Sequence, residues 1–257
     1  TLVIATSTKA TQETVEALET ANAKGAVTIG LTGYSDSATA QTAQYSLTYY
    51  HSDDWYHDPT LVHCNSQGTA LKLAFVLLKE FEGYAAYDKA MAAFEKLPTI
   101  YAKAYQDIKP VAVEFAMRYQ NDEIWNALAS GAMWECAYSD AFCFFQEMQT
   151  VHCVPCHSGE YFHGAFETTD RNLAVLLMKS VGRTRALDER AERFLEKFGG
   201  HHFILDAKEL GLDQLDGEVA EYFNALLVHP ITKQLIAAMG DVRMKKELTF
   251  CCKMVLF

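Results

Sequence analysis

Short apolar runs alternate with a helical pattern over the first 50 residues. Runs at 2–5, 26–31 and 45–49 have the length and composition of buried strands, and a helical pattern to about residue 24 follows the first. Gly25 comes directly after that pattern, a common place for a helix to end. An alternating order of strands and helices is typical of a parallel sheet with crossover helices, so we predict an α/β unit here.

The middle of the chain has helical periodicity throughout. We predict three helices, over 68–82, 84–97 and 101–119. Pro98 and Pro110 are expected to break or kink them, because proline lacks the N–H that a helix interior requires.

Apolar runs and helical patterns alternate again after residue 120. We predict strands at 123–129, 152–157, 172–179 and 201–206, and helical segments at 134–149, 161–167, 188–198 and 219–239, the last kinked near Pro230. The predicted fold is therefore α/β, with two three-layer units whose parallel sheets are flanked by helices. We place the domains at 1–66, 67–120 (a helical connection) and 121–257.

The composition limits the class of protein. Half of the 257 residues are apolar, enough for a sizeable core, and a formal charge of −11 argues against a nucleic-acid partner. Seven Cys among apolar neighbours are typical of reduced thiols, so we predict a cytoplasmic protein. No signal peptide or membrane-spanning apolar run is visible, and no membrane partner is predicted.

The segment after the first apolar run, residues 6–14, is rich in hydroxyl side chains and leads into a helix. In parallel sheets, ligands lie beyond the carboxyl ends of the strands, and helix N termini attract anions. This segment is therefore a candidate phosphate-binding loop. The alternative is an ordinary strand-to-helix turn in which Ser and Thr serve only as caps.

Glu147 and His163 are candidate proton carriers. Glu147 lies in the apolar run 141–148, where a carboxylate must find water, find a partner or shift its pKa. His163 follows sixteen residues later, and a carboxylate with an imidazole can move protons near neutral pH. We interpret the two as an acid/base pair. The alternative is a helix carboxylate that meets water and an ordinary surface or satisfied histidine.

Two segments carry metal-binding residue types. The connection at 50–66 is rich in His and Asp, but its spacing matches no standard zinc pattern. The hexapeptide at 152–157, HCVPCH, contains a Cys-x-x-Cys that could be a redox pair or half of a zinc site. Four ligands so close in sequence rarely converge on one ion, so we prefer small buried thiols. We predict no metal and no cofactor.

Five motifs are distributed over nearly the whole chain. They are TSTKATQET at 6–14, ASGA at 129–132, FFQEMQ at 144–149, HSGEYFHGAFE at 157–167 and DERAERFLEKFG at 188–199. These motifs resemble those of the sugar isomerase (SIS) domain family. The tail TFCCKMVLF at 249–257 looks like the C-terminal strand of the same family. The resemblance is closest to the deglycases that act on 6-phosphorylated Amadori compounds.

The resemblance implies a site for a phosphorylated sugar. It implies two SIS domains in a homodimer or a dimer-based oligomer, with an active site shared between subunits. Glu147 is the implied base, His163 assists ring opening from the neighbouring subunit, and Lys253 lies near the sugar. The implied phosphate-binding residues are Thr6, Ser7, Thr8 and Thr11, and Ser130 and Gly131 are the candidate substrate-binding residues of the ASGA motif.

The chain also departs from the family pattern. Lys9 stands where the phosphate loop usually has Gly, and Ala165 stands where the family has Pro. The chain starts without Met on an apolar run, and the family's first phosphate-contacting loop should lie upstream of Thr1. We therefore expect a first unit truncated at its N terminus and a complete second unit.

The implied activity is cleavage of a 6-phosphorylated ketosamine, such as fructoselysine 6-phosphate, to glucose 6-phosphate and a free amine. An aldose–ketose phosphosugar isomerase or a glucosamine-6-phosphate deaminase could use the same pair of residues. A regulator that binds a phosphosugar without catalysis is the third alternative.

Overall fold

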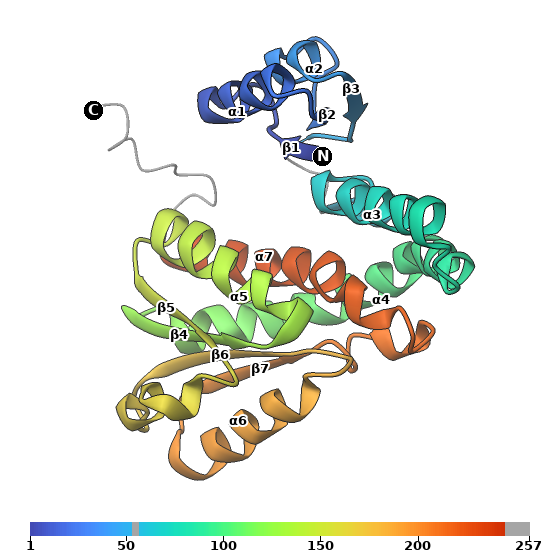
Figure 1. Cartoon of the computed structure of the whole chain (residues 1–257). Helices are drawn as coiled ribbons and strands as arrows, with labels where there is room; N and C mark the ends of the chain where they lie inside the picture. Colours follow the sequence, from blue (N-terminus) through green and yellow to red (C-terminus); the bar gives the residue numbers. More distant parts are fainter. Residues whose placement is uncertain (53–56, 245–257) are drawn as a thin grey trace. The chain divides into compact units, whose positions relative to one another are not determined.

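The computed structural model describes residues 1–52 and 57–244, and the chain divides into two compact units, Thr1–Pro98 and Thr99–Phe257 (Figure 1). The boundary falls inside helix α4 (Tyr87–Tyr119), so each unit contains a part of this helix. Each unit has a parallel sheet of its own.

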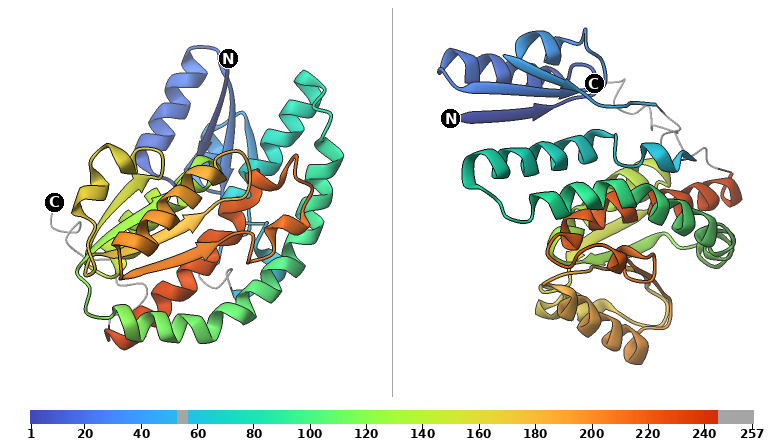
Figure 2. Two further views of the ribbon diagram at one scale, coloured as in Figure 1. Left: turned by 90° about the horizontal axis from the view of Figure 1, so that it is seen from below. Right: turned by 90° about the vertical axis from the view of Figure 1, so that its right-hand side faces the viewer.

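The first unit has a three-stranded parallel sheet in the order β1-β2-β3. Its elements are β1 (Leu2–Thr6), α1 (Gln12–Ala23), β2 (Val27–Thr32), α2 (Ala38–Thr42), β3 (Tyr45–Thr48), the 3₁₀ turn η2 (Pro59–Leu61) and α3 (Ser66–Glu82). Helices α1 and α2 lie on one face of the sheet and α3 lies on the other (Figure 2). The predicted parallel α/β unit is confirmed.

Helix α4 corrects one prediction, because it runs without interruption through Pro98 and Pro110. Each proline costs an interior helix about 3 kcal/mol. The compensation is a continuous buried stripe at helical spacing, which includes Leu97, Tyr101, Ala104, Ile108, Ala112, Phe115 and Tyr119. Burial along this stripe outweighs the two missing hydrogen bonds.

The second unit has a four-stranded parallel sheet in the order β5-β4-β6-β7. Its strands are β4 (Ile124–Ala129), β5 (His152–His157), β6 (Ala174–Lys179) and β7 (His202–Asp206). Its longer helices are α5 (Trp134–Ser139), which continues as the π-helix η4 (Asp140–Met148), then α6 (Arg185–Phe198) and α7 (Asn224–Val242). Its 3₁₀ turns are η3 (Gly131–Met133), η5 (Tyr161–His163), η6 (Ala165–Thr168), η7 (Leu212–Gln214) and η8 (Ala220–Phe223).

Helices cover both faces of this second sheet, which gives the predicted three layers. Buried side chains of β4 and β6 meet α6 in one cluster, formed by Leu128, Tyr161, Val175, Leu177, Ala191 and Leu195. On the opposite face the Trp125 ring lies 4.9 Å from that of Phe145 in η4 and 5.8 Å from that of Phe115 in α4. All six residues of β6 are buried, as a central parallel strand requires.

The predicted strands and helices of this unit are present, and α7 continues through Pro230. The π-helical turn was not predicted. The apolar tail at 248–257, with its predicted strand and Lys253, lies outside the described residues. None of the described helices is both long enough and apolar enough to cross a membrane.

A buried ion cluster joins the carboxyl ends of β6 and β7 to α6. Asp206 accepts two hydrogen bonds from the Arg185 guanidinium, at 2.8 and 2.7 Å, and lies 3.0 Å from the Lys179 amino group. Burial alone would raise the pKa of Asp206, but the hydrogen bonds from Arg185, from the Lys208 N–H and from Lys179 outweigh it and lower the pKa to about 2. The ionised carboxylate therefore stabilises the fold.

Replacing Asp206 by Asn is expected to reduce the free energy of unfolding at pH 7 by about 2–3 kcal/mol. The group has a lowered folded pKa, so its contribution is present above pH 3.8 and is lost as the pH falls towards 2. Urea unfolding of both proteins between pH 7 and pH 3 should show the difference shrinking in acid. Asp213→Asn, an exposed control, should change little. A difference that stays constant down to pH 3 would contradict the assignment.

Candidate active site

Ser7 organises the loop between β1 and α1. Its side chain is buried, and its hydroxyl oxygen accepts the Thr11 N–H at 2.9 Å and lies 3.1 Å from the Thr11 hydroxyl. Its own N–H donates to the Leu31 carbonyl on β2 at 3.0 Å. The loop is thereby folded back against the start of α1 in a fixed conformation.

Thr8 connects this loop to the loops that follow β2 and β3. Its carbonyl oxygen accepts the Gly33 N–H and the Thr32 hydroxyl, both at 3.0 Å. The Tyr49 hydroxyl donates to the Thr8 hydroxyl oxygen at 3.2 Å. Hydroxyl groups and loop amides therefore meet at the carboxyl edge of the sheet, where parallel α/β folds bind ligands.

The N terminus of α1 is open towards this edge. Thr11 is the N-cap residue, but its hydroxyl contacts Ser7 and does not cap the helix. In the described part of the chain, no protein oxygen accepts the N–H groups of Gln12 and Glu13. Free N–H groups and the positive end of a helix favour a bound anion, so the loop has the chemistry of a phosphate site.

Lys9 fits this loop without backbone strain. Among the described residues other than glycine, only Thr150 and Met244 have positive φ, so Lys9 does not need the conformation that favours glycine. Its side chain is exposed, and its amino group lies 5.3 Å from the centre of the Tyr34 ring. Lys9 adds a positive charge to the edge of the loop.

Glu147 lies in the last turn of η4, in the second unit, and is half-buried. Among the described residues it has no hydrogen-bond or ion-pair partner. Three residues later, Thr150 has φ of 54°, a left-handed conformation that is rare for a β-branched residue. π-Helical segments and strained backbone are both frequent at functional sites, so Glu147 stays a candidate.

A buried Asp–His pair connects η4 to α7. The Asp140 carboxylate is fully buried and lies 2.7 Å from His229 Nδ1, and the His229 ring stacks on Phe144 with 4.8 Å between ring centres. Burial raises the pKa of Asp140, and His229 partly opposes that rise. No sequence pattern indicated this pair, because the partners are 89 positions apart.

His163 lies in the 3₁₀ turn η5 and is exposed. The preceding residue Phe162 anchors the turn: its ring centre lies 5.6 Å from that of Phe194 and 3.9 Å from the Arg190 guanidinium. The turn therefore packs on the α6 face of the sheet, whereas the helix that carries Glu147 packs on the other face (Figure 1). The second unit by itself does not bring Glu147 and His163 together.

Ser130 and Gly131 lie at the carboxyl end of β4. Ser130 is fully buried, and its hydroxyl donates to the Thr184 carbonyl at 3.2 Å. Gly131 has φ of +54°, and a Cβ there would lie 2.3 Å from the Thr184 hydroxyl oxygen. Both residues keep the turn close to the start of α6. Gly131 is exposed and Ser130 is buried, so a ligand could reach only Gly131 directly.

The Cys-x-x-Cys residues do not form a reactive pair. Cys153 and Cys156 lie on β5, three positions apart, so their side chains point to opposite faces of the strand. Both are free thiols, and burial raises the pKa of each, that of Cys153 to about 12. Among the described residues, no three metal-ligating side chains form a cluster. Asp53 and Asp54 of the polar connection lie outside those residues.

Comparison with known structures defines the class of protein. No protein-family model matches the chain. A crystal structure from Salmonella typhimurium LT2, assigned as a phosphosugar isomerase, matches with a TM-score of 0.90 and 33% sequence identity, over 97% of this chain and 76% of that one. The fold is therefore that of phosphosugar isomerases.

Curated relatives define the family within this class. Fructosamine deglycase FrlB of Bacillus subtilis (strain 168) is 32% identical over 233 residues, which are 91% of this chain and 70% of the relative. Fructoselysine 6-phosphate deglycase of Escherichia coli (strain K12) is 22% identical over 207 residues, and the chain spans only 56% of its length. The chain belongs to the SIS family of phosphosugar isomerases and deglycases.

Gly131→Ala is expected to destabilise the second unit by about 1–2 kcal/mol, because a side chain would have to adopt a left-handed conformation and approach Thr184. Gly217→Ala is the matched control, since its Cβ would meet no atom within 4 Å and its φ is not positive. Urea unfolding measures both variants. Equal stability of the two would show that the turn tolerates a side chain.

Proposed function

We propose that this protein is a deglycase that cleaves a 6-phosphorylated ketosamine to glucose 6-phosphate and a free amine. The observation that carries the proposal is the 32% identity with fructosamine deglycase over 91% of the chain. The open N terminus of α1, surrounded by hydroxyl groups, supports a phosphorylated substrate.

The phosphate of the substrate would lie at the β1–α1 loop. The hydroxyls of Thr6 and Thr8 and the first N–H groups of α1 are the available donors. Ser7 and Thr11 act mainly by holding the loop, because their side chains contact each other. The residues of the turn at Ser130 and Gly131 remain candidates for substrate contact, and Lys253 lies outside the described residues.

The chemistry is a pair of proton transfers followed by hydrolysis. His163 assists opening of the sugar ring, since an imidazole can donate and accept protons near neutral pH. Glu147 then removes a proton from C1 of the open-chain ketosamine, and a proton is added at C2. This converts the ketosamine to the imine of an aldose. Water adds to that imine, and the resulting carbinolamine breaks down to glucose 6-phosphate and the free amine.

The two proton carriers would act in a site shared between two copies of the chain. Within the second unit Glu147 and His163 are on opposite faces of the sheet. His163 is exposed on a turn fixed by Phe162, so it is available to a neighbouring molecule. We therefore propose a dimer, or an oligomer built from dimers, in which His163 of one subunit serves Glu147 of the other.

Aldose–ketose isomerisation of a phosphosugar is the second candidate. It is favoured by the similarity to a structure assigned as a phosphosugar isomerase. The two reactions share the proton transfer between C1 and C2, and only the deglycase releases an amine. Incubation with fructoselysine 6-phosphate, with glucosamine 6-phosphate and with fructose 6-phosphate separates them by product.

Glu147→Gln should lower kcat for amine release about 10²–10⁴-fold while leaving substrate binding in place, because the amide keeps the shape and cannot accept the C1 proton. Glu209→Gln replaces an exposed glutamate and serves as the control. Released amine is quantified under saturating substrate. Undiminished turnover of the Glu147→Gln protein would remove Glu147 from the mechanism.

Mixing two inactive variants tests the shared site. Glu147→Gln and His163→Asn subunits, unfolded together and refolded, should regain about a quarter of the wild-type activity, because half of the dimers are mixed and each has one intact site. Each variant refolded alone is the control. The oligomers must first be shown to be mixed. If their activity is then no higher than that of the separate variants, Glu147 and His163 do not act together across two subunits.

A further inference from the structure

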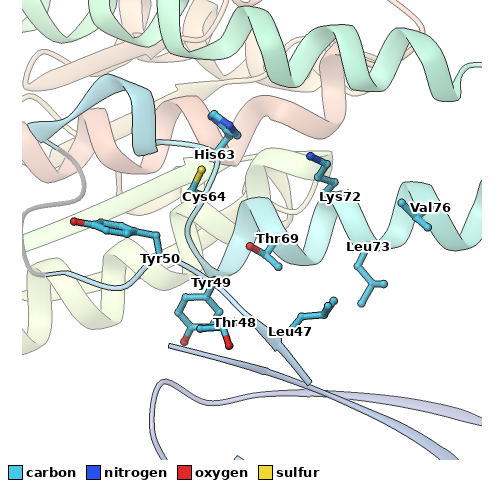
Figure 3. Close-up of a pocket in the computed structure, with 10 residues that line it drawn as sticks. All are labelled: Leu47, Thr48, Tyr49, Tyr50, His63, Cys64, Thr69, Lys72, Leu73 and Val76. Carbon is cyan, nitrogen blue, oxygen red and sulfur yellow. The ribbon is translucent and has the colours of Figure 1, made fainter. Parts of the chain in front are cut away.

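The first unit contains a cavity of about 560 Å³ between β3 and α3 (Figure 3). Its lining comes from the end of β3, from the segment before α3 and from α3 itself: Leu47, Thr48, Tyr49, Tyr50, His63, Cys64, Thr69, Lys72, Leu73 and Val76. Its size is within the range of small-molecule binding sites, roughly 300–1,000 Å³.

Tyr49 joins this cavity to the candidate phosphate loop. It lines the cavity, and its hydroxyl donates to the Thr8 hydroxyl oxygen at 3.2 Å. The two sites therefore share one residue. Tyr49 thus places the cavity next to the loop.

The wall opposite β3 is preformed. The Tyr50 N–H donates to the Cys64 carbonyl at 2.9 Å, and the Asn65 side chain caps α3 by accepting the Gly68 N–H at 2.9 Å. A Cβ at residue 68 would lie 2.1 Å from the His63 carbonyl oxygen. Glycine at this position lets the segment of His63 and Cys64 lie against the first turn of α3.

The cavity has a positive charge and an unsatisfied ring nitrogen. Lys72 is exposed, and among the described residues no carboxylate pairs with it; its amino group lies 5.9 Å from the centre of the Phe94 ring. His63 Nδ1 is buried without a hydrogen-bond partner. Burial, and then the charge of Lys72, lower the pKa of His63 and so favour the neutral imidazole.

The lining residues select the chemistry of a ligand. None of the ten described lining residues carries a carboxylate, and Figure 3 shows His63 and Lys72 on the same side of the close-up. Leu47, Leu73 and Val76 supply an apolar surface. An anionic group joined to an aliphatic chain complements this combination.

We propose that this cavity binds the amine half of the ketosamine, and that Lys72 binds its carboxylate. The inference rests on the proposed deglycase function and adds the residue and the cavity that would recognise an amino acid in preference to a simple alkylamine. The phosphate at the loop and the carboxylate at Lys72 would fix the two ends of the open chain. Such fixation holds the reacting carbons in one position.

The test compares two substrates that differ only at the far end. They are the 6-phosphorylated ketosamines of γ-aminobutyrate and of butylamine. The preference is measured as the ratio of the two kcat/KM values, and the wild-type protein should prefer the γ-aminobutyrate substrate. Lys72→Met should reduce this ratio by about 10–100-fold, because one charge-assisted hydrogen bond is lost. Lys72→Arg should retain most of the preference.

Lys79→Met is the matched control, since Lys79 is exposed on the same helix and its amino group lies over the Tyr87 ring, outside the cavity. A ratio unchanged in Lys72→Met, or changed equally in Lys79→Met, would overturn the inference while leaving the deglycase function in place. Release of no amine from either substrate by the wild-type protein would instead overturn the proposed function.

Discussion

Thr8 holds together the carboxyl ends of the three strands in the first unit. Its carbonyl oxygen accepts hydrogen bonds from Gly33 and Thr32, and its hydroxyl accepts one from Tyr49. Parallel strands are joined by long crossovers, which leave the loops at this edge without a tight turn to fix them. Hydrogen bonds between the loops must do so. The position of the candidate anion-binding loop, and of the cavity wall to which Tyr49 contributes, depends on these bonds.

The second unit has a corresponding loop, between β6 and α6, in which two N–H groups already have carboxylate acceptors. The buried Asp188 carboxylate accepts the Ser180 N–H and hydroxyl and the Ser158 hydroxyl. Glu221 accepts the Arg183 N–H and pairs with its guanidinium. Two carboxylates of the chain thus accept N–H groups of this loop. At α1 the N–H groups of Gln12 and Glu13 have no acceptor among the described residues, which favours the first unit as the place of the candidate anion site.

The sequence predicted those features that depend on neighbouring positions. The strands were found because their apolar runs are continuous, and the hydroxyl-rich loop because its residues are consecutive. Helix α4 was divided wrongly at Pro98, since a local rule for proline cannot weigh a buried stripe that continues on both sides. The Asp140–His229 pair and the cavity beside Lys72 arise from contacts between distant segments. Gly68 allows the segment of His63 and Cys64 to lie against α3 and so form the cavity wall. The sequence shows only a glycine near the start of a helix.

The separation of Glu147 from His163 within the second unit follows from the strand order. The chain moves from β4 to the edge strand β5, and then returns across β4 to β6. Crossovers between parallel strands are almost always right-handed, so two successive crossovers in opposite directions must lie on opposite faces of the sheet. The first crossover carries Glu147 and the second carries His163. The buried sheet lies between the two crossovers, so a change of side-chain conformation cannot bring Glu147 and His163 into contact within one unit. The proposed reaction, in which Glu147 and His163 act on one substrate, would therefore need a second copy of the chain.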